Sequence, residues 1–208
     1  MEQGSTEWHA ARLGKLTASR IKDAFAKTSK GWGAGRANLM AQLICERLTG
    51  SPTATFVNDA MRWGTETEPQ ARAAYAFHMG EEVEEVGFVD HPTIPMAGAS
   101  PDGLVGKLGL LEIKCPNTAT HLDTLESLAA PPDYIPQMQW QMACTGRQWC
   151  DFASFDPRLP EPMRLFVTRV LRDEAYIREQ EAMAREFLAE LDAKIARLRQ
   201  RYELAEAA

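Results

Sequence analysis

The stretch that most constrains the fold runs from Ala99 to Pro116, where two short extended segments follow each other with only a turn between them. The segment from Leu110 to Cys115 has the alternating, apolar-rich pattern of a β-strand. The Gly-Lys-Leu-Gly segment at 106–109 is typical of the turn of a hairpin. We therefore expect a β-hairpin here, and we expect its second strand to be the central strand of a sheet.

The predicted hairpin gathers side chains that suit metal-dependent hydrolysis. Side chains alternate faces along a strand, so Glu112 and Lys114 share one face while Ile113 points into the core. The hairpin can return Asp102, which lies in a Pro-Asp-Gly turn, to the side of Glu112. Two close carboxylates repel each other, and Mg²⁺ relieves the repulsion while keeping positions for water and phosphate oxygens. The Ile113 carbonyl could add a ligand, and Lys114 could hold or polarise the attacking water.

A Glu-x-Lys triplet alone is common on surface hairpins, so its context decides between an incidental pair and a catalytic one. Here Ser100-Pro101-Asp102 precedes Glu112-Ile113-Lys114, and together they resemble the bipartite signature of the PD-(D/E)xK nuclease superfamily. Other segments follow the order seen in the lambda exonuclease, or YqaJ-type viral recombinase, family. These are Glu7-Trp8-His9, Arg12-Leu13-Gly14, Thr17-Ala18-Ser19, Trp63-Gly64 with Glu68, Gln137-Met138-Gln139 and Phe155-Asp156-Pro157-Arg158.

The resemblance implies a restriction-endonuclease-like α/β (α+β) core, with a central mixed β-sheet flanked by helices. It also implies a Mg²⁺-dependent 5′→3′ exonuclease, for which Mn²⁺ could substitute. Such an enzyme digests one strand of linear double-stranded DNA from a 5′-phosphorylated end and leaves a 3′ overhang for phage-type homologous recombination. Family members form a homotrimer ring threaded by DNA, and a single-strand annealing protein is the implied partner. The implied setting is a phage or prophage protein in the cytoplasm of a bacterial host.

Three residues on predicted helices receive roles from the same resemblance. Glu68 matches a glutamate that approaches the active site, and Gln137 matches a glutamine that orders the water or metal shell. Met61 matches an apolar residue thought to wedge into the end of the duplex. Without the family, Glu68 is a solvated helix residue and Met61 is a core residue. Gln137 and Gln141 share one helix face by their i,i+4 spacing.

The resemblance also implies a pocket for the 5′-terminal phosphate, formed by Arg12, Ser19 and Ser100. From the residues themselves, Thr17 is placed to N-cap a helix over 18–26, and a helix N-terminus offers free N–H groups to a phosphate. A capping residue beside a surface arginine is the simpler interpretation. The Gly-rich basic loop that follows could contact DNA, but we assign no site residue within it.

The remaining elements follow from periodicity and breaker residues. We expect helices over 7–12, 38–48, 58–79, 121–129, 137–145 and 173–206, and strands over 81–90, 95–99, 149–155 and 164–171. A chain of 208 residues suits one nuclease domain, 1–208, in which the segment 173–206 is a long C-terminal helix.

The net charge of −6 argues against a protein that coats DNA through bulk charge. It does not exclude a nuclease, because an active site needs carboxylates and divalent ions restore the attraction locally. Four cysteines without a CxxC pair favour a reducing, cytoplasmic compartment. No apolar run approaches the roughly 20 residues that span a bilayer.

Two other functions stay open at this point. A non-catalytic DNA-end-binding module would keep the fold, but it would not need the complete set of Asp102, Glu112 and Lys114. A site-specific PD-(D/E)xK endonuclease would use the same chemistry. The Arg12 pocket and the Trp8 segment favour the exonuclease.

Overall fold

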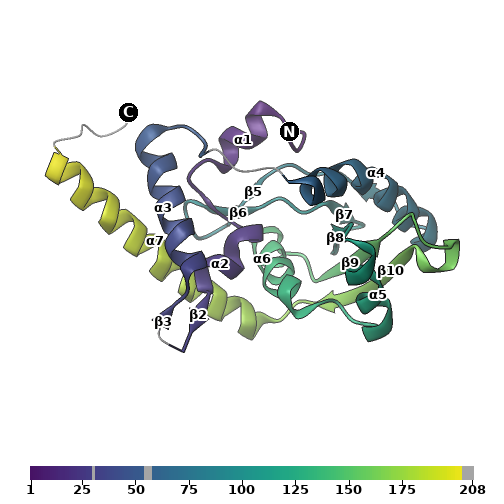
Figure 1. The fold of residues 1–208 in the computed structure, drawn as a ribbon. Coiled ribbons are helices and arrows are strands. Elements are labelled where there is room, and N and C mark those ends of the chain that lie inside the picture. The colour runs from purple at the N-terminus through teal and green to yellow at the C-terminus, as the bar shows by residue number, and fades with distance from the viewer. Residues whose placement is uncertain (30, 54–57, 203–208) are drawn as a thin grey trace.

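The computed structural model describes residues 1–29, 31–53 and 58–202 (Figure 1). Its helices are α1 (Thr6–Arg12), α2 (Ile21–Phe25), α3 (Ala34–Thr49), α4 (Asp59–Met79), α5 (Thr118–Ser127), α6 (Ile135–Thr145) and α7 (Glu174–Tyr202). Its strands are β1 (Leu16–Thr17), β2 (Lys27–Thr28), β3 (Gly31–Trp32), β4 (Val83–Glu84), β5 (Val89–Asp90), β6 (Ala97–Ala99), β7 (Gly103–Val105), β8 (Gly109–Lys114), β9 (Trp149–Phe155) and β10 (Leu165–Leu171).

The main sheet has the strand order β10-β9-β8-β7-β4, so β8 is its central strand, as predicted. Strand β8 pairs parallel to β9, and the other pairs are antiparallel. A parallel pair needs a long crossover, and α5 and α6 supply it. The predicted mixed sheet flanked by helices, with a long C-terminal helix, is confirmed. A smaller sheet, β1-β6-β5, and the hairpin β2-β3 complete the strands of the described residues.

The alternation of side chains along β8 builds a separate core on each face of the sheet. Leu111 and Ile113 pack with Tyr75 of α4 on one face. Leu110 packs with Met138 of α6 on the other face, together with the first turns of α7. Glu112 therefore lies on the α6 face, within reach of that helix, while Ile113 lies in the core as predicted.

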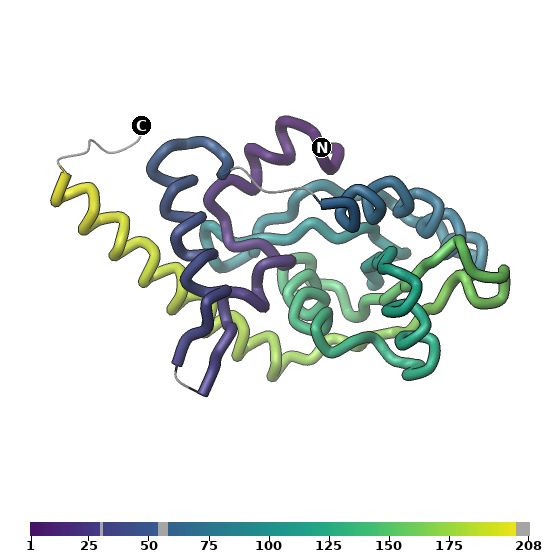
Figure 2. The backbone as a smooth tube through the Cα atoms, viewed as in Figure 1, coloured from purple at the N-terminus to yellow at the C-terminus, as the bar shows by residue number. Residues whose placement is uncertain are grey.

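A third core cluster joins the N-terminal elements to α6 and α7. Leu39 and Leu43 of α3 pack with Trp140 of α6 and with Phe187 and Leu191 of α7. Figure 2 shows α7, coloured green to yellow, running from the sheet past α3. Phe187 and Leu191 are therefore buried against the body of the chain. The expected segment 203–206 of this helix lies outside the described residues.

Four predicted elements differ from the structure by more than two residues at an end, and one of them is the helix expected over 38–48, because α3 begins at Ala34. The helix expected over 18–26 is a 3₁₀ turn, η1 (Ala18–Arg20), followed by the short α2. Thr17 occupies the N-cap position, but its side chain makes no capping hydrogen bond; its Oγ1 lies 3.4 Å from Ser19 Oγ. The strand expected over 81–90 is divided between the two sheets, because β4 pairs with β7 while β5 pairs with β6.

The helix expected over 121–129 begins earlier, because Asn117 caps α5 by accepting a hydrogen bond from the Thr120 N–H. His121 consequently lies inside the helix, where its side chain is fully buried. Its ring nitrogens lie 2.7 Å from Ser154 Oγ and 2.8 Å from the Met163 carbonyl. His121 is thus a structural residue.

In the described residues, no helix is both long enough and apolar enough to cross a membrane.

Candidate active site and phosphate pocket

A cleft of about 930 Å³ opens where α4 approaches the end of β8. Strand β8 contributes Ile113 and Lys114 to its lining, and the turn before β7 contributes Asp102. The remaining lining comes from α4, from the first turn of α5, from the segments on either side of α5, and from the loop after β9. It comprises Asp59, Ala60, Met61, Trp63, Gly64, Thr65, Glu68, Cys115, Pro116, Asn117, Thr120, Tyr134 and Arg158.

The predicted return of Asp102 to Glu112 is confirmed. The antiparallel register pairs Gly103 with Leu111, and one further step brings Asp102 opposite Glu112. Asp102 Oδ2 accepts a hydrogen bond of 2.7 Å from the Ile113 N–H, which holds the carboxylate against β8. A Cβ atom at position 103 would lie 2.3 Å from Val83 Cγ1, so the turn requires glycine there.

Asp102 carries an energetic cost that a cation would relieve. Burial raises the pKa of this carboxyl well above its usual range, and the negative charge of Glu112 raises it further. Lys114 opposes both effects without cancelling them. A site that keeps two carboxylates together in this way is electrostatically suited to a divalent cation.

Glu112 is fully buried, and three donors hold it in one orientation. Gln137 Nε2 donates to Oε1 over 2.6 Å, and Gln141 Nε2 donates to Oε2 over 2.6 Å. Lys114 Nζ also donates to Oε1. The i,i+4 face predicted for Gln137 and Gln141 is confirmed. The sequence interpretation placed Gln137 in the site but left out Gln141, although the shared face was a sufficient signal for both.

Lys114 is an ammonium group at neutral pH. Burial lowers its pKa, but the charges of Glu112 and Asp102 more than offset this, so the net change is upward. The amine therefore acts as a cation and hydrogen-bond donor. This state fits the predicted role of holding water or offsetting phosphate charge.

Glu68 is a paired residue of the cleft wall, so its interpretation as a solvated helix glutamate is wrong. Its Oε1 accepts a 2.5 Å hydrogen bond from Arg72 Nη2. Burial raises the pKa of Glu68, with Arg72 opposing the rise and Glu112 adding to it. Arg72 Nε also donates to the Asp102 carbonyl over 3.3 Å, which links α4 to the turn that carries Asp102. The sequence analysis missed Arg72, whose signal was an i,i+4 pairing with Glu68.

The donor set fits a hard divalent ion better than zinc. Zinc sites are commonly built from Cys and His ligands, whereas Mg²⁺ takes one or two protein carboxylates and keeps water and phosphate oxygens in its other positions. Asp102 and Glu112 offer two carboxylates. Ile113, whose carbonyl is the third predicted ligand, lies between Glu112 and Lys114 on β8. Oε2 of Glu112 accepts from Gln141 alone among the described residues, so it keeps a lone pair for a cation.

A second pocket, of about 320 Å³, contains the predicted phosphate-binding residues. Arg12 and Ser19 line it together with Trp8. Ser100 Oγ accepts hydrogen bonds from Trp8 Nε1 over 2.9 Å and from Arg12 Nη1 over 3.2 Å. The Arg12 guanidinium carbon lies 3.9 Å from the Trp8 ring centroid. The three predicted residues therefore meet at one place, and the interpretation of a surface arginine beside a helix cap is wrong.

Arg12 keeps its charge in this pocket. Burial lowers its pKa to about 10, so the guanidinium is protonated at neutral pH. A helix N-terminus contributes less positive potential to this pocket than predicted, because Ser19 lies in a 3₁₀ turn. The pocket consequently depends on side-chain donors and not on a helix N-terminus.

Met61 lies on the border between the two pockets and lines both of them. Its side chain is 51% exposed, so the core-packing interpretation is wrong.

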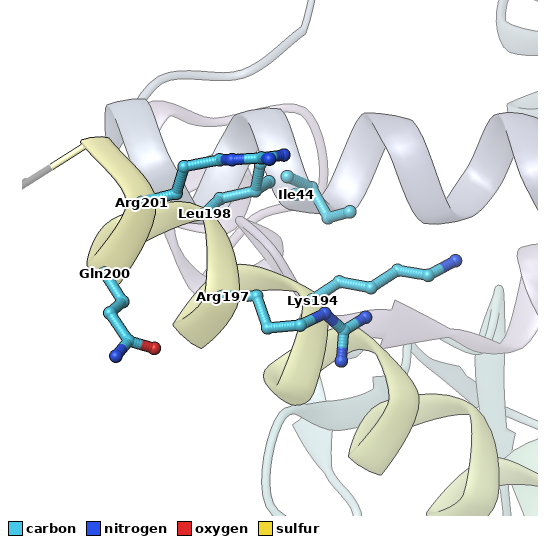
Figure 3. Close-up of a pocket in the computed structure, with 6 residues that line it drawn as sticks. All are labelled: Ile44, Lys194, Arg197, Leu198, Gln200 and Arg201. Carbon is cyan, nitrogen blue, oxygen red and sulfur yellow. The ribbon is translucent and has the colours of Figure 1, made fainter.

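Another cavity, of about 520 Å³, lies between α3 and the end of α7 (Figure 3). Its lining consists of Ile44, Lys194, Arg197, Leu198, Gln200 and Arg201. None of these lining residues is a carboxylate, so this cavity cannot hold the metal-dependent chemistry.

Comparisons with known proteins agree with this geometry. The family model of the YqaJ-like viral recombinase domain matches residues 7–148. A crystal structure of LHK-Exo, an alkaline exonuclease from Laribacter hongkongensis, has a TM-score of 0.90 and 56% identity, covering 97% of this chain and 100% of that one. Another crystal structure, of LHK-Exo in complex with dAMP, matches equally well.

Two further relatives are more distant. A phage-related exonuclease from Haemophilus somnus 129PT has a TM-score of 0.67 at 16% identity, covering 87% of this chain and 96% of that one, which is a likeness of fold alone. An uncharacterized protein, R354 of Acanthamoeba polyphaga mimivirus, is 29% identical over 165 residues. That match covers 73% of this chain, and the chain spans only 28% of the length of this curated relative.

Proposed function

Because the chain belongs to the YqaJ-like viral recombinase family, we propose that it is a metal-dependent exonuclease that digests one strand of linear duplex DNA in the 5′→3′ direction. The observation that carries the proposal is the convergence of three side chains beside the Arg12 pocket: Asp102 and Lys114 line one cleft, and the buried Glu112 is hydrogen-bonded to Lys114. The likeness to LHK-Exo, an alkaline exonuclease, supports the same activity.

Asp102 and Glu112, with the main chain of Ile113, would hold Mg²⁺ or Mn²⁺. When bound, the ion would polarise the phosphodiester and lower the pKa of a water molecule. The Lys114 ammonium orients that water or offsets charge on the scissile phosphate. Gln137 supports the site through its hydrogen bond to Glu112, and Glu68 supports it from the facing helix.

The Arg12 pocket would set the direction of digestion. Arg12, Ser19 and Ser100 would bind the 5′-terminal phosphate, while the scissile phosphodiester lies in the neighbouring cleft. Met61, on the border, would separate the terminal nucleotide from its partner strand. Digestion from a 5′-phosphorylated end would leave a 3′ single-stranded overhang suited to recombination.

The wider setting of the activity follows the family. We propose one nuclease domain over residues 1–208, a homotrimeric ring threaded by DNA, and a single-strand annealing protein as partner. These parts of the proposal are supported by family membership alone.

The deciding experiment compares end-labelled linear DNA with covalently closed circles, each incubated with purified protein and Mg²⁺ or with EDTA. We expect progressive loss of 5′-phosphorylated linear duplex, no loss of circles, and no reaction in EDTA. Cleavage of the circles would support the endonuclease instead. Binding of DNA ends without any cleavage, across a range of divalent ions, would support the non-catalytic module.

A further inference from the structure

Two sequence segments meet at the wall of the cleft, and the proposed chemistry gives neither of them a role. Trp63 comes from α4, and Arg158 follows β9 in the Phe-Asp-Pro-Arg segment. The guanidinium carbon of Arg158 lies 4.5 Å from the centroid of the Trp63 ring, a cation–π contact. Both side chains line the same cleft as Lys114.

Arg158 is held rigidly by Asp156, whose side chain is fully buried. Arg158 Nε donates to Oδ1 over 2.7 Å and Nη2 donates to Oδ2 over 2.9 Å, which forms a two-pronged ion pair. Thr118 Oγ1 also donates to Oδ2, over 2.7 Å. Burial raises the pKa of Asp156, but the hydrogen bonds from Arg158 and Thr118 outweigh this and lower it to about 2. The pair is therefore charged and fixed at any pH of use.

Donors remain at this wall after the pair has formed. Nη1 of Arg158 has no hydrogen-bond acceptor among the described residues, and the Arg158 side chain is 47% exposed. Nε1 of Trp63 is buried and, within the described part of the chain, also has no acceptor. A buried N–H without a partner is costly, and a ligand oxygen at this wall would satisfy it.

The charge of the cleft also points to Arg158. The basic residues that line the cleft in the described structure are Lys114 and Arg158, and they face Asp59, Glu68 and Asp102. Lys114 is engaged by Glu112. Among the described lining residues, Arg158 is therefore the cationic side chain outside the metal site that a polyanionic strand in this cleft would meet.

We propose that Arg158, oriented by Asp156 and stacked on Trp63, binds a backbone phosphate of the strand being cut, at a subsite next to the scissile phosphodiester. The ligand is a phosphodiester oxygen, for which a fixed guanidinium supplies directed N–H groups. Trp63 is a positioning residue that limits the rotation of the guanidinium. This inference rests on the proposed nuclease function.

The test measures binding of a 5′-phosphorylated duplex in EDTA at several salt concentrations. We expect Arg158→Ala to weaken binding by about tenfold, as for loss of a hydrogen bond to a charged group. The slope of log K against log salt should fall by about 0.9, the value for one released phosphate contact. Arg158→Lys should recover the slope but only part of the affinity. Arg164→Ala is the matched control, because Arg164 donates to the Leu159 carbonyl and does not line the cleft.

Two further measurements separate phosphate binding from a structural role. Single phosphates of the DNA are replaced one at a time by neutral methylphosphonates. Replacement at one linkage should weaken binding by the wild-type protein, and the same replacement should not weaken binding by Arg158→Ala any further. The double variant Asp156→Asn/Arg158→Ala removes the carboxylate left behind, and it should stay as weak as Arg158→Ala. Thermal unfolding checks that each variant is folded.

The inference is overturned if Arg158→Ala matches wild type in affinity, slope and methylphosphonate profile. It is also overturned if adding Asp156→Asn to Arg158→Ala restores binding, because the defect then comes from the unpaired Asp156 charge. The wild-type assay on linear DNA separates these results from failure of the proposed function. If the wild-type protein degrades linear DNA and Arg158→Ala binds the duplex with wild-type affinity, only the proposed phosphate subsite is contradicted.

Discussion

Gln141 Nε2 donates a 2.6 Å hydrogen bond to Oε2 of Glu112, and both side chains are fully buried. We expect Gln141→Leu to reduce exonuclease activity by roughly 10–100-fold, the range for groups that orient metal ligands. The reason is that Glu112 loses one of three donors and can rotate away from the metal position. Activity is measured with the Mg²⁺ concentration varied, and more Mg²⁺ should restore part of the loss. Gln70→Leu, at an exposed position of α4, is the control. Equal activity of the two variants would contradict this role.

Asp102 should lower the stability of the metal-free protein. Its folded-state pKa is raised by burial and by Glu112, so its ionisation costs stability once the pH passes the unfolded-state value. That cost is present at neutral pH. We expect Asp102→Asn to be inactive and yet to unfold at a higher temperature in EDTA, by about 2–4 °C for each kcal/mol gained. Mg²⁺ should stabilise wild type and not the variant. A lower unfolding temperature in EDTA would contradict this account.

The acid side of the pH–activity profile should depend on the metal concentration. Burial raises the pKa of both Glu68 and Asp102, so protons compete with the cation at pH values above the usual carboxylate range. At limiting Mg²⁺, kcat/KM should rise with pH, and additional Mg²⁺ should shift that rise to lower pH. Lys114, whose pKa is raised, should cause no loss at mildly alkaline pH. A profile that does not move with Mg²⁺ would be the opposite result.

Met61 should matter for activity and not for stability. Its exposed side chain borders both pockets, so Met61→Ala should change the free energy of unfolding by no more than about 0.5 kcal/mol. Leu43→Ala, in the buried cluster of α3, should cost about 2–5 kcal/mol. Digestion of blunt duplex ends by Met61→Ala should be slower, while pre-frayed ends should be digested at the wild-type rate. Denaturant unfolding and digestion rates on the two substrates check this. Slow digestion of both substrates would argue against a role at the duplex end.

Arg12 should determine the preference for a 5′-phosphorylated end. Arg12→Ala should remove most of the rate difference between 5′-phosphate and 5′-hydroxyl ends, because the loss falls on the phosphorylated substrate. Ser100→Ala should produce a smaller change in the same direction, since Ser100 accepts a hydrogen bond from Arg12. Arg62→Ala, which lines neither pocket, is the control. An unchanged preference in Arg12→Ala would place the terminal phosphate elsewhere.

The sequence predicted the hairpin of the candidate active site because its signals are local. Strand alternation put Glu112 and Lys114 on one face, and the Gly-rich turn returned Asp102 to them. The i,i+4 spacing placed Gln137 and Gln141 on one helix face in the same way. Family resemblance then named Arg12, Ser19 and Ser100; in the structure Arg12 and Ser19 line one pocket, and Ser100 accepts a hydrogen bond from Arg12.

Contacts between distant segments decided the rest. The segment 81–90 alternates like one strand, but its two halves pair with β7 and with β6 in separate sheets. Met61 has the pattern of a core residue, yet the pocket border leaves it exposed. The meeting of Trp63 with Arg158 has no sequence signal at all, because it depends on how α4 packs over the end of the sheet.

By itself, then, the sequence determined which side chains can act together along one strand or one helix, because backbone periodicity sets those relations within a few residues. Only the tertiary structure decided which elements face each other across the cleft, how deeply each carboxylate is buried, and which donors reach it. Those outcomes follow from packing and desolvation between segments far apart in the chain, and no local pattern records them.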